Sequence, residues 1–154
     1  MRSLRQCLED IAQSKNIAIF CHTMPDADTI ASAVALKKLI KQNLPEGIQE
    51  KQIDIFVDAQ EINEINGAMI KNIETNVQNC EKYDLAISVD CSTPERMGKY
   101  ESLFFSSKKT INIDHHSTNT NFAENNLVLK TSSTCEGIYI CLLYTSDAAD
   151  DLIG

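Results

Sequence analysis

The chain has 154 residues, of which 43% are hydrophobic and 23% charged, and its formal net charge is -8. This length predicts one domain with a full core and excludes two domains of ordinary size. The sequence contains no apolar run long enough to span a membrane. The acidic balance argues against a duplex nucleic acid partner, which needs a basic track, but it is compatible with small phosphorylated ligands because divalent cations reverse the local charge.

The first half of the chain is predicted to contain two helices and two strands from the spacing of its apolar residues. In order, the predicted elements are a helix over Leu4 to Ser14, a strand over Ile17 to Cys21, a helix over Ile30 to Ile40 and a strand over Ile53 to Val57. Pro45 and Gly47 are predicted to end the second helix. One or two short helices are predicted between residues 58 and 79.

The second half continues the alternation of strands and helices. Strands are predicted over Tyr83 to Val89, over Lys108 to Ile113, and near Phe122 and Leu127 to Leu129. Two S/T-x-x-E patterns, which begin at Ser92 and at Ser133, predict capping boxes at helix starts. This order predicts an α/β fold with a mostly parallel β-sheet and helices on both faces. The first residues do not resemble a signal peptide, so we expect a cytoplasmic protein with no membrane partner.

Side chains that can ligate a metal follow three of the predicted strands. They are His22, Asp26 and Asp28 after the first strand, Asp90 after the third, and Asp114, His115 and His116 after the fourth. The three histidines of the chain all lie in these clusters. Because parallel strands end at one edge of the sheet, we expect the clusters to meet in one acidic, histidine-bearing pocket. Pro25 is expected to hold Met24 extended and so to stiffen the first turn.

The donor set predicts the kind of metal. Carboxylates mixed with imidazole, without a thiolate cluster, favour Mn²⁺, with Mg²⁺, Co²⁺ or Fe²⁺ as alternatives. A bridging carboxylate, Asp28 or Asp90, could hold two ions about 3.5–4 Å apart, as in two-metal hydrolases of phosphate compounds. His116 would then bind a phosphoryl oxygen or protonate the leaving group.

The six cysteines include no C-x-x-C pair, so we expect free thiols packed as small hydrophobes and not a disulfide framework. Cys21 and Cys91 adjoin candidate ligands, so a thiol ligand stays open as a minor alternative. Three other aspartates are expected to be solvated: Asp54, Asp58 and Asp84.

The strand-end motifs carry a family resemblance. His22-x-x-Pro25-Asp26-x-Asp28, the strand-end Asp90 and Asp114-His115-His116 resemble, in order and approximate spacing, the first three signature motifs of the DHH phosphoesterase superfamily. The resemblance implies an α/β domain, usually followed by a smaller substrate-binding domain, and manganese-dependent hydrolysis of phosphoesters or phosphoanhydrides. The residues that match metal ligands are His22, Asp26, Asp28, Asp90 and His115. His116 matches the residue at the substrate phosphate and, with Asp28 and Asp90, the catalytic set, whereas Asp114 and Ser32 match supporting positions.

Within the superfamily, the segment from Asp114 to Phe122 and the segment from Ser133 to Glu136 are most similar to the branch of nanoRNases and 3′-phosphoadenosine-5′-phosphate phosphatases. This likeness implies short oligonucleotides or that phosphorylated nucleotide as substrates. Related branches that cleave cyclic or linear dinucleotides, single-stranded DNA or pyrophosphate are the alternatives. The acidic charge argues against the exonuclease branch, and Thr29, where the pyrophosphatase branch usually has Ser, argues against that one. A homodimer stays open.

The end of the chain departs from the family pattern. The fourth motif, which supplies a further metal-binding Asp, and the second domain are missing, so residues 1–140 are expected to be a C-terminally truncated catalytic domain. Residues 141–154 resemble a translated sequencing-library adapter, with a genuine helix and acidic tail as the alternative. Ala31, where the family usually has Gly before Ser32, is a minor departure. For this chain, an inactive domain that binds metal or nucleotide is therefore the alternative to an enzyme.

Overall fold

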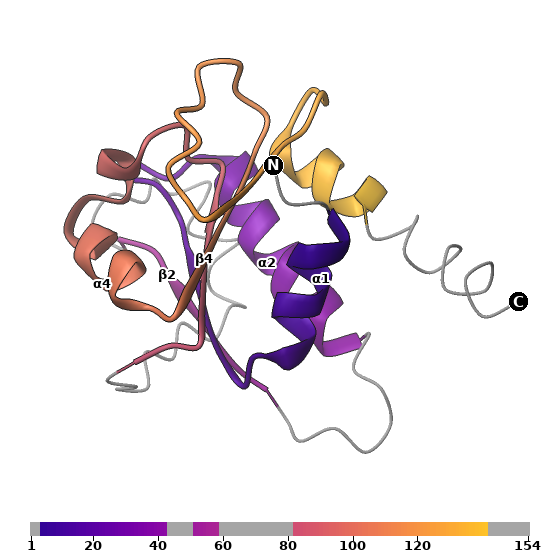
Figure 1. Ribbon diagram of the computed structural model, residues 1–154. Helices are drawn as coiled ribbons and strands as arrows, with labels where there is room; N and C mark the ends of the chain where they lie inside the picture. The colour runs from indigo at the N-terminus through magenta and orange to yellow at the C-terminus, as the bar shows by residue number, and fades with distance from the viewer. Residues whose placement is uncertain (1–3, 43–50, 59–81, 142–154) are drawn as a thin grey trace, which may run out of the picture.

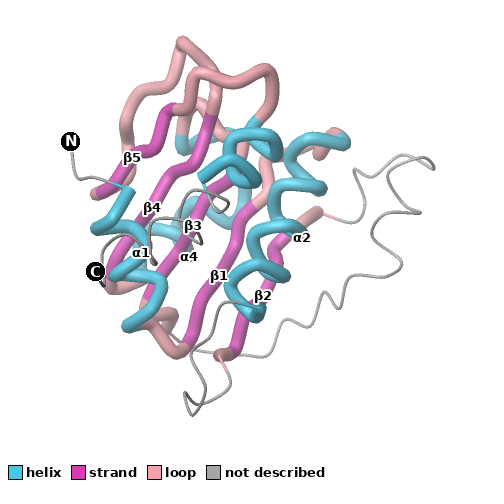
Figure 2. The backbone as a smooth tube through the Cα atoms, turned by 90° about the vertical axis from the view of Figure 1, so that its right-hand side faces the viewer, coloured by secondary structure: helices cyan, strands magenta, loops and turns pink. Residues whose placement is uncertain are grey.

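The computed structural model describes residues 4–42, 51–58 and 82–141. Its centre is a five-stranded sheet in the order β2-β1-β3-β4-β5, and every neighbouring pair is parallel (Figure 2). The strands are β1 (Asn16–Phe20), β2 (Gln52–Phe56), β3 (Leu85–Val89), β4 (Lys109–Asp114) and β5 (Asn125–Val128). The α/β class and the parallel sheet predicted from the sequence are confirmed.

Helices cover both faces of this sheet (Figures 1 and 2). Helices α1 (Leu4–Gln13) and α2 (Ala27–Gln42) pack on one face, together with a helix over residues 134–141. The 3₁₀-helix η2 (Pro94–Tyr100) and α4 (Glu101–Ser106) pack on the other. None of the helices in these described residues is long and apolar enough to cross a membrane.

The core is divided by the sheet into two layers. Alternate strand residues such as Ile19 and Ile87 pack under α1 and α2, whereas Phe20 and Ala86 pack under η2 and α4. In the second layer the rings of Phe20 and Phe56 stack at a centroid distance of 4.8 Å. Because both faces are covered, β3 is buried at every position, which explains why all its residues but Ser88 are apolar, and the Ser88 hydroxyl accepts a hydrogen bond from Asn112 Nδ2 at 2.9 Å.

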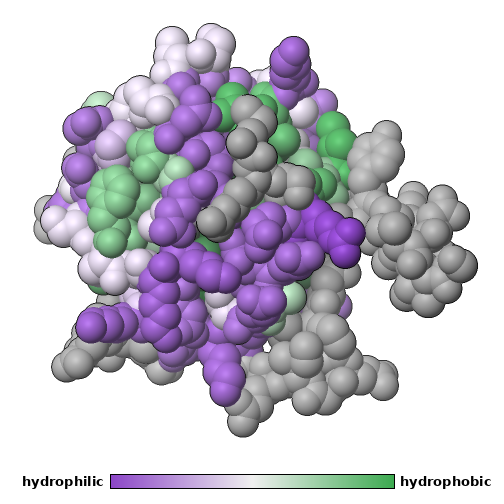
Figure 3. Space-filling model, in the orientation of Figure 1, coloured by the Kyte–Doolittle hydropathy of each residue, from purple (hydrophilic) through white to green (hydrophobic). Residues whose placement is uncertain are grey.

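The surface outside these layers is mainly hydrophilic on the face seen in Figure 3. Hydrophobic side chains form separate patches there, one of them on the side of η2 and α4. Phe105, which is 48% exposed, lies in α4 and makes an edge contact with the ring of Phe104.

One predicted capping box is wrong. The helix after β3 has Thr93 and not Ser92 at its N-cap, and the Thr93 side chain makes no capping hydrogen bond. Pro94 occupies the first position, which suits a helix start without a donor. Gly98, with φ +55°, then kinks the chain within η2, before α4 begins at Glu101. The segment therefore forms a 3₁₀ turn and a short α-helix, where the capping pattern had predicted one helix.

All three aspartates predicted to be solvated are bonded in the fold, and Asp58 pairs with Lys99 Nζ at 2.7 Å. Asp54 is buried, and its Oδ2 accepts a hydrogen bond of 2.7 Å from the Tyr83 hydroxyl. Asp84 accepts hydrogen bonds from the amides of Lys15 and Asn16 at 3.1 Å each and from Lys108 Nζ at 2.7 Å. These donors, of which Lys108 has the largest effect, lower the pKa of the Asp84 carboxyl to about 2. The sequence shows only that Asp54 lies in an alternating strand and that Asp84 follows a loop. Neither pattern reveals partners that are distant in the sequence.

Three predictions concern residues outside the described ranges. They are the end of the second helix at Pro45 and Gly47, the short helices predicted between residues 58 and 79, of which residues 59–79 lie outside, and the tail, of which residues 142–154 lie outside.

We predict that Asp84→Asn lowers the free energy of unfolding by about 2 kcal/mol at pH 7. The folded-state pKa of about 2 lies below the ordinary value of 3.8. The stabilisation is therefore complete above that ordinary value and is lost as the pH falls through the folded-state pKa. Urea unfolding at pH 7, 4 and 2.5 measures the change.

The matched control is Glu9→Gln, because Glu9 pairs with Arg5 in an exposed i,i+4 pair. That pair is worth only about 0.3–0.5 kcal/mol. An Asp84→Asn variant that is no less stable than Glu9→Gln at pH 7 would contradict the assignment.

Candidate metal centre

The turn after β1 carries the first cluster. Its backbone is held from η2, because the Thr23 amide donates to the Arg96 carbonyl at 2.7 Å. Asp26 caps α2, with its Oδ1 accepting from the Thr29 amide at 3.0 Å. The same oxygen lies 3.7 Å from Nε2 of the buried His22. Capping thus fixes the carboxylate beside the imidazole.

Met24 does not adopt the extended conformation predicted for it. Its φ is +49°, in the left-handed region, although it precedes proline. The turn is fixed on both sides, by the long-range bond from the Thr23 amide to the Arg96 carbonyl and by the local Asp26 cap, and together these bonds override the preference that proline imposes on Met24.

Gly98 of η2 packs closely against this turn. A Cβ atom at Gly98 would stand 2.7 Å from Cγ2 of Thr23, which is closer than carbon atoms approach. Its φ of +55° is also one that side-chain-bearing residues rarely adopt. Glycine therefore allows η2 to approach the residue next to His22.

Asp90 lies at the carboxyl end of the central strand β3 and is 2% exposed. Its φ of +59° turns the chain sharply, and its amide donates to the Ile113 carbonyl at 2.9 Å. Its Oδ2 lies 3.7 Å from His22 Nε2, and its Oδ1 lies 3.6 Å from His115 Nε2. The two oxygens of one carboxylate therefore face the clusters on either side.

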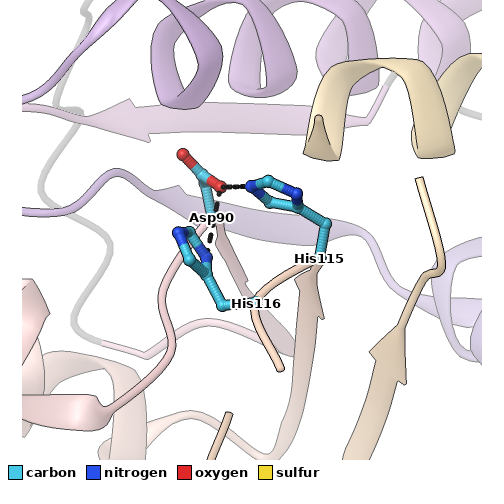
Figure 4. A group of neighbouring side chains, drawn as sticks. All are labelled: Asp90, His115 and His116. Atoms are coloured by element: carbon cyan, nitrogen blue, oxygen red, sulfur yellow. Dashed lines mark ion pairs between the residues drawn. The ribbon is translucent and has the colours of Figure 1, made fainter. Parts of the chain in front are cut away.

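His115 and His116 follow β4 and both point toward Asp90 (Figure 4). His116 Nδ1 lies 3.8 Å from Asp90 Oδ1. The two rings are tilted, with centroids 4.4 Å apart. The structure thus contains two sets of possible metal-ligating atoms, and within each set the atoms lie within 4.8 Å of one another. One set comes from His22, Asp26 and Asp90, and the other from Asp90, His115 and His116. Asp90 belongs to both.

The hydrogen bonds of the histidines orient their rings. Nδ1 of His22 lies 2.6 Å from the Thr23 carbonyl, and Nδ1 of His115 lies 3.4 Å from the Thr131 carbonyl. A carbonyl only accepts, so each Nδ1 carries the proton and, in the neutral ring, leaves Nε2 with its lone pair. In both residues that Nε2 faces the Asp90 carboxylate. This is the orientation that metal-ligating histidines show, with the other ring nitrogen bonded to a carbonyl or carboxylate.

His116 is oriented differently, through Asp114. Its Nδ1 lies 2.7 Å from Oδ1 of the fully buried Asp114. Asn119 Nδ2 donates to Asp114 Oδ2 at 2.6 Å and to Asn112 Oδ1 at 2.7 Å. This network holds Asp114 in place and leaves Nε2 of the 44% exposed His116 side chain for another partner. Asn112 could have been noticed in the sequence, because it is a polar residue inside an otherwise mainly apolar strand segment, Ile111 to Ile113.

Asp28 and Ser32 lie on α2 and differ in their contacts. Asp28 Oδ2 is 3.9 Å from His115 Nε2, so Asp28 lies at the edge of the centre. Its two oxygens accept from the amides of Thr134 and Cys135 at 2.9 and 3.0 Å, which the sequence did not reveal. Ser32 is buried, but no hydrogen bond joins its Oγ to any described residue. Its supporting role remains a prediction.

Charges in the centre are mutually stabilised. Burial alone would lower the pKa of His22, but the neighbouring Asp90, the Thr23 carbonyl and Asp26 outweigh it and raise the pKa. Burial alone would raise the pKa of Asp90, but His22, Thr134 and His116 outweigh it and lower the pKa. Asp90 is therefore an ionised carboxylate inside the protein at neutral pH.

The neighbouring thiols are poor ligands. Burial raises the pKa of Cys21 to about 12, and burial also raises the pKa of Cys91 well above its ordinary value. Both thiols are therefore protonated at neutral pH in the metal-free protein, and neither sulfur belongs to the two sets of metal-ligating atoms that come together within the described residues. The five cysteines within the described residues are free, as predicted.

Comparisons with known proteins agree with this fold. The family model of the DHH family, N-terminal domain, matches residues 16–152. The crystal structure of an exopolyphosphatase-related protein from Bacteroides fragilis superposes with a TM-score of 0.65 at 19% sequence identity. That match covers 92% of this chain and 43% of the other, so this chain spans less than half the length of its structural relative. No curated protein matches the sequence.

We predict that Gly98→Ala lowers the free energy of unfolding by about 2 kcal/mol, because it adds a side chain at positive φ and a collision with Thr23. Thr23→Ser removes the Cγ2 atom involved in that collision. In the Thr23→Ser background the same substitution should therefore cost less. A double-mutant cycle measured by denaturant unfolding provides the comparison. An equal loss in both backgrounds would rule out the contact.

Proposed function

We propose a function from the premise that this chain belongs to the DHH family, whose N-terminal domain model matches residues 16–152. We infer that it is the catalytic domain of a metal-dependent phosphoesterase. The observation that carries the proposal is Asp90, whose carboxylate faces His22 and Asp26 on one side and His115 and His116 on the other.

The residues present fit a pair of divalent cations. Carboxylate oxygens and imidazole nitrogens suit Mn²⁺, and the centre has no thiolate. In this proposal His22, Asp26 and Asp90 would hold one ion, and Asp90, Asp28 and His115 would hold the other. When bound, such ions supply Lewis acidity to phosphoryl oxygens and lower the pKa of water.

In this proposal His116 is the hydrogen-bond or proton donor to the substrate. Asp114 Oδ1 accepts a hydrogen bond from the N–H at Nδ1, so the ring is fixed with Nε2 directed away from the buried network. Protonated on both nitrogens, His116 would donate from Nε2 to a phosphoryl oxygen or to the leaving oxygen. Asp114, which is fully buried and bonded by Asn119, keeps the ring in this orientation.

The finer proposal concerns the substrate. We propose short oligonucleotides or 3′-phosphoadenosine 5′-phosphate, with Mn²⁺ as the metal. The support is the resemblance of the segments after β4 and around Thr134 to that branch, and a net charge of -8, which disfavours long nucleic acids. Polyphosphate is an alternative substrate in this proposal, because the structural relative is described as exopolyphosphatase-related.

We predict that the 154-residue chain with Mn²⁺ hydrolyses di- to tetranucleotides or the phosphorylated nucleotide faster than cyclic dinucleotides, pyrophosphate or polyphosphate. Asp90→Asn removes the shared charge and should lower the rate at least about 100-fold. Asp28→Ala should abolish turnover. Product release is followed by anion-exchange chromatography with and without chelator.

Glu9→Gln is the control, since it removes a carboxylate from the exposed face of α1. It should retain full activity. Unchanged hydrolysis by Asp90→Asn would refute the centre. A wild-type chain that binds Mn²⁺ and turns over none of these compounds would favour the alternative, a binding domain.

A further inference from the structure

The helix over residues 134–141 begins directly against the two carboxylates of the centre. Oγ1 of Thr134 donates to Asp90 Oδ1 at 2.8 Å. The amides of Thr134 and Cys135 donate to Asp28 Oδ2 and Oδ1 at 2.9 and 3.0 Å. Thr134 itself is fully buried. One residue thus bonds both Asp90 and Asp28.

We propose that Thr134 is a positioning residue for the metal ligands, an inference that rests on the proposed metal-dependent function. It acts through Asp90, with which its hydroxyl makes the bond, and through Asp28, which its amide holds. The family match and the ligand motifs assign it no role.

The hydroxyl of Thr134 fixes how the Asp90 carboxylate is turned. With Oδ1 bonded to Thr134, Oδ2 faces His22 Nε2 and Oδ1 also faces His115 Nε2. Rotation of the carboxylate would move both oxygens from these positions. Because Thr134 is fully buried, water cannot take the place of a lost hydroxyl without a rearrangement. The bond therefore sets the geometry of the residue that both donor groups share.

The backbone of the helix start fixes Asp28 in a similar way. Each carboxylate oxygen accepts one of two successive amides, at the positive end of the helix dipole. This holds Asp28 Oδ2 at 3.9 Å from His115 Nε2. Each oxygen keeps a second lone pair, so the bonds orient the carboxylate without using up its capacity to bind a cation.

The helix start is itself fixed by its neighbours. Ser133 Oγ caps the helix by accepting from the Glu136 amide at 3.1 Å, which confirms the predicted Ser133 cap. The Glu136 carboxylate bonds the Ser132 amide at 2.9 Å, one residue earlier than a capping box requires. A Cβ atom at Gly137 would collide with Cδ1 of Leu129, so the glycine allows the helix to pack closely.

The same segment also supports His115. The Thr131 carbonyl lies 3.4 Å from His115 Nδ1, and Thr131 Oγ1 donates to the Ser133 carbonyl at 2.7 Å. Residues 131–135 thus contact His115, Asp90 and Asp28 in turn. Each of these three is a proposed ligand, and Thr134 bonds two of them directly.

We predict that Thr134→Val, which keeps the shape of the side chain and removes the donor, weakens Mn²⁺ binding about 10- to 100-fold. Thr134→Ser keeps the hydroxyl and should restore the affinity to within about threefold of the wild type. The measurement is isothermal titration calorimetry of the 154-residue chain with MnCl₂, and circular dichroism of the metal-free proteins shows that each variant is folded.

The matched control is Thr120→Val. Thr120 is exposed, and its hydroxyl donates to the Ser92 carbonyl at 3.3 Å and to no carboxylate of the centre. Its affinity for Mn²⁺ should equal that of the wild type. Wild-type affinity in a folded Thr134→Val variant would overturn the inference, whereas a wild-type chain that binds no Mn²⁺ would overturn the proposed function.

A second measurement needs no variant at position 134. In the metal-free wild type, the amide protons of Thr134 and Cys135 should exchange slowly with solvent, because both are bonded to Asp28. Asp28→Ala should make both exchange at least about tenfold faster and leave the Glu136 amide, bonded to Ser133, less affected. Equal exchange at residues 134 and 135 in the two proteins would overturn the inference even where Thr134→Val fails to fold.

Discussion

The buried charge of Asp90 is the constraint on which the arrangement of the centre depends. An ionised carboxylate that is 2% exposed needs partners from several directions, because burial without them is costly. The structure supplies the Thr134 hydroxyl at 2.8 Å and the imidazoles of His22 and His116, and these three partners lower the pKa of Asp90. The turn at φ +59° that aims this side chain is secured by the bond from its amide to Ile113.

The sheet topology explains why residues so far apart in the chain reach this carboxylate. The chain passes from β1 to β2 on one side and then to β3 on the other side of β1. The carboxyl ends of β1 and β3 therefore border a topological switch point, where parallel α/β sheets bind ligands. His22 follows β1 and Asp90 follows β3, so the pair stands at this point. His115 and His116 come from β4, the next strand.

The sequence predicts what depends on strand order and local chemistry, and it misses what depends on long-range packing. His22, Asp90 and His115 could be placed together because parallel strands end at one edge. The bonds from Thr134 to Asp90 and Asp28 span 44 and 106 residues, and no periodic pattern reveals them. Met24 and Asp54 were predicted wrongly for the same reason, since tertiary contacts override a local preference in one and bury the other. The substrate, the metal, partners and location stay predictions.

The most direct test of the account is anomalous diffraction at the manganese edge from crystals of this chain grown with MnCl₂. The account predicts a peak in contact with Asp90 Oδ2 and His22 Nε2, and any second peak in contact with Asp90 Oδ1 and His115 Nε2. Both positions would share one carboxylate. Manganese bound elsewhere on the acidic surface, with none in contact with Asp90, would contradict it.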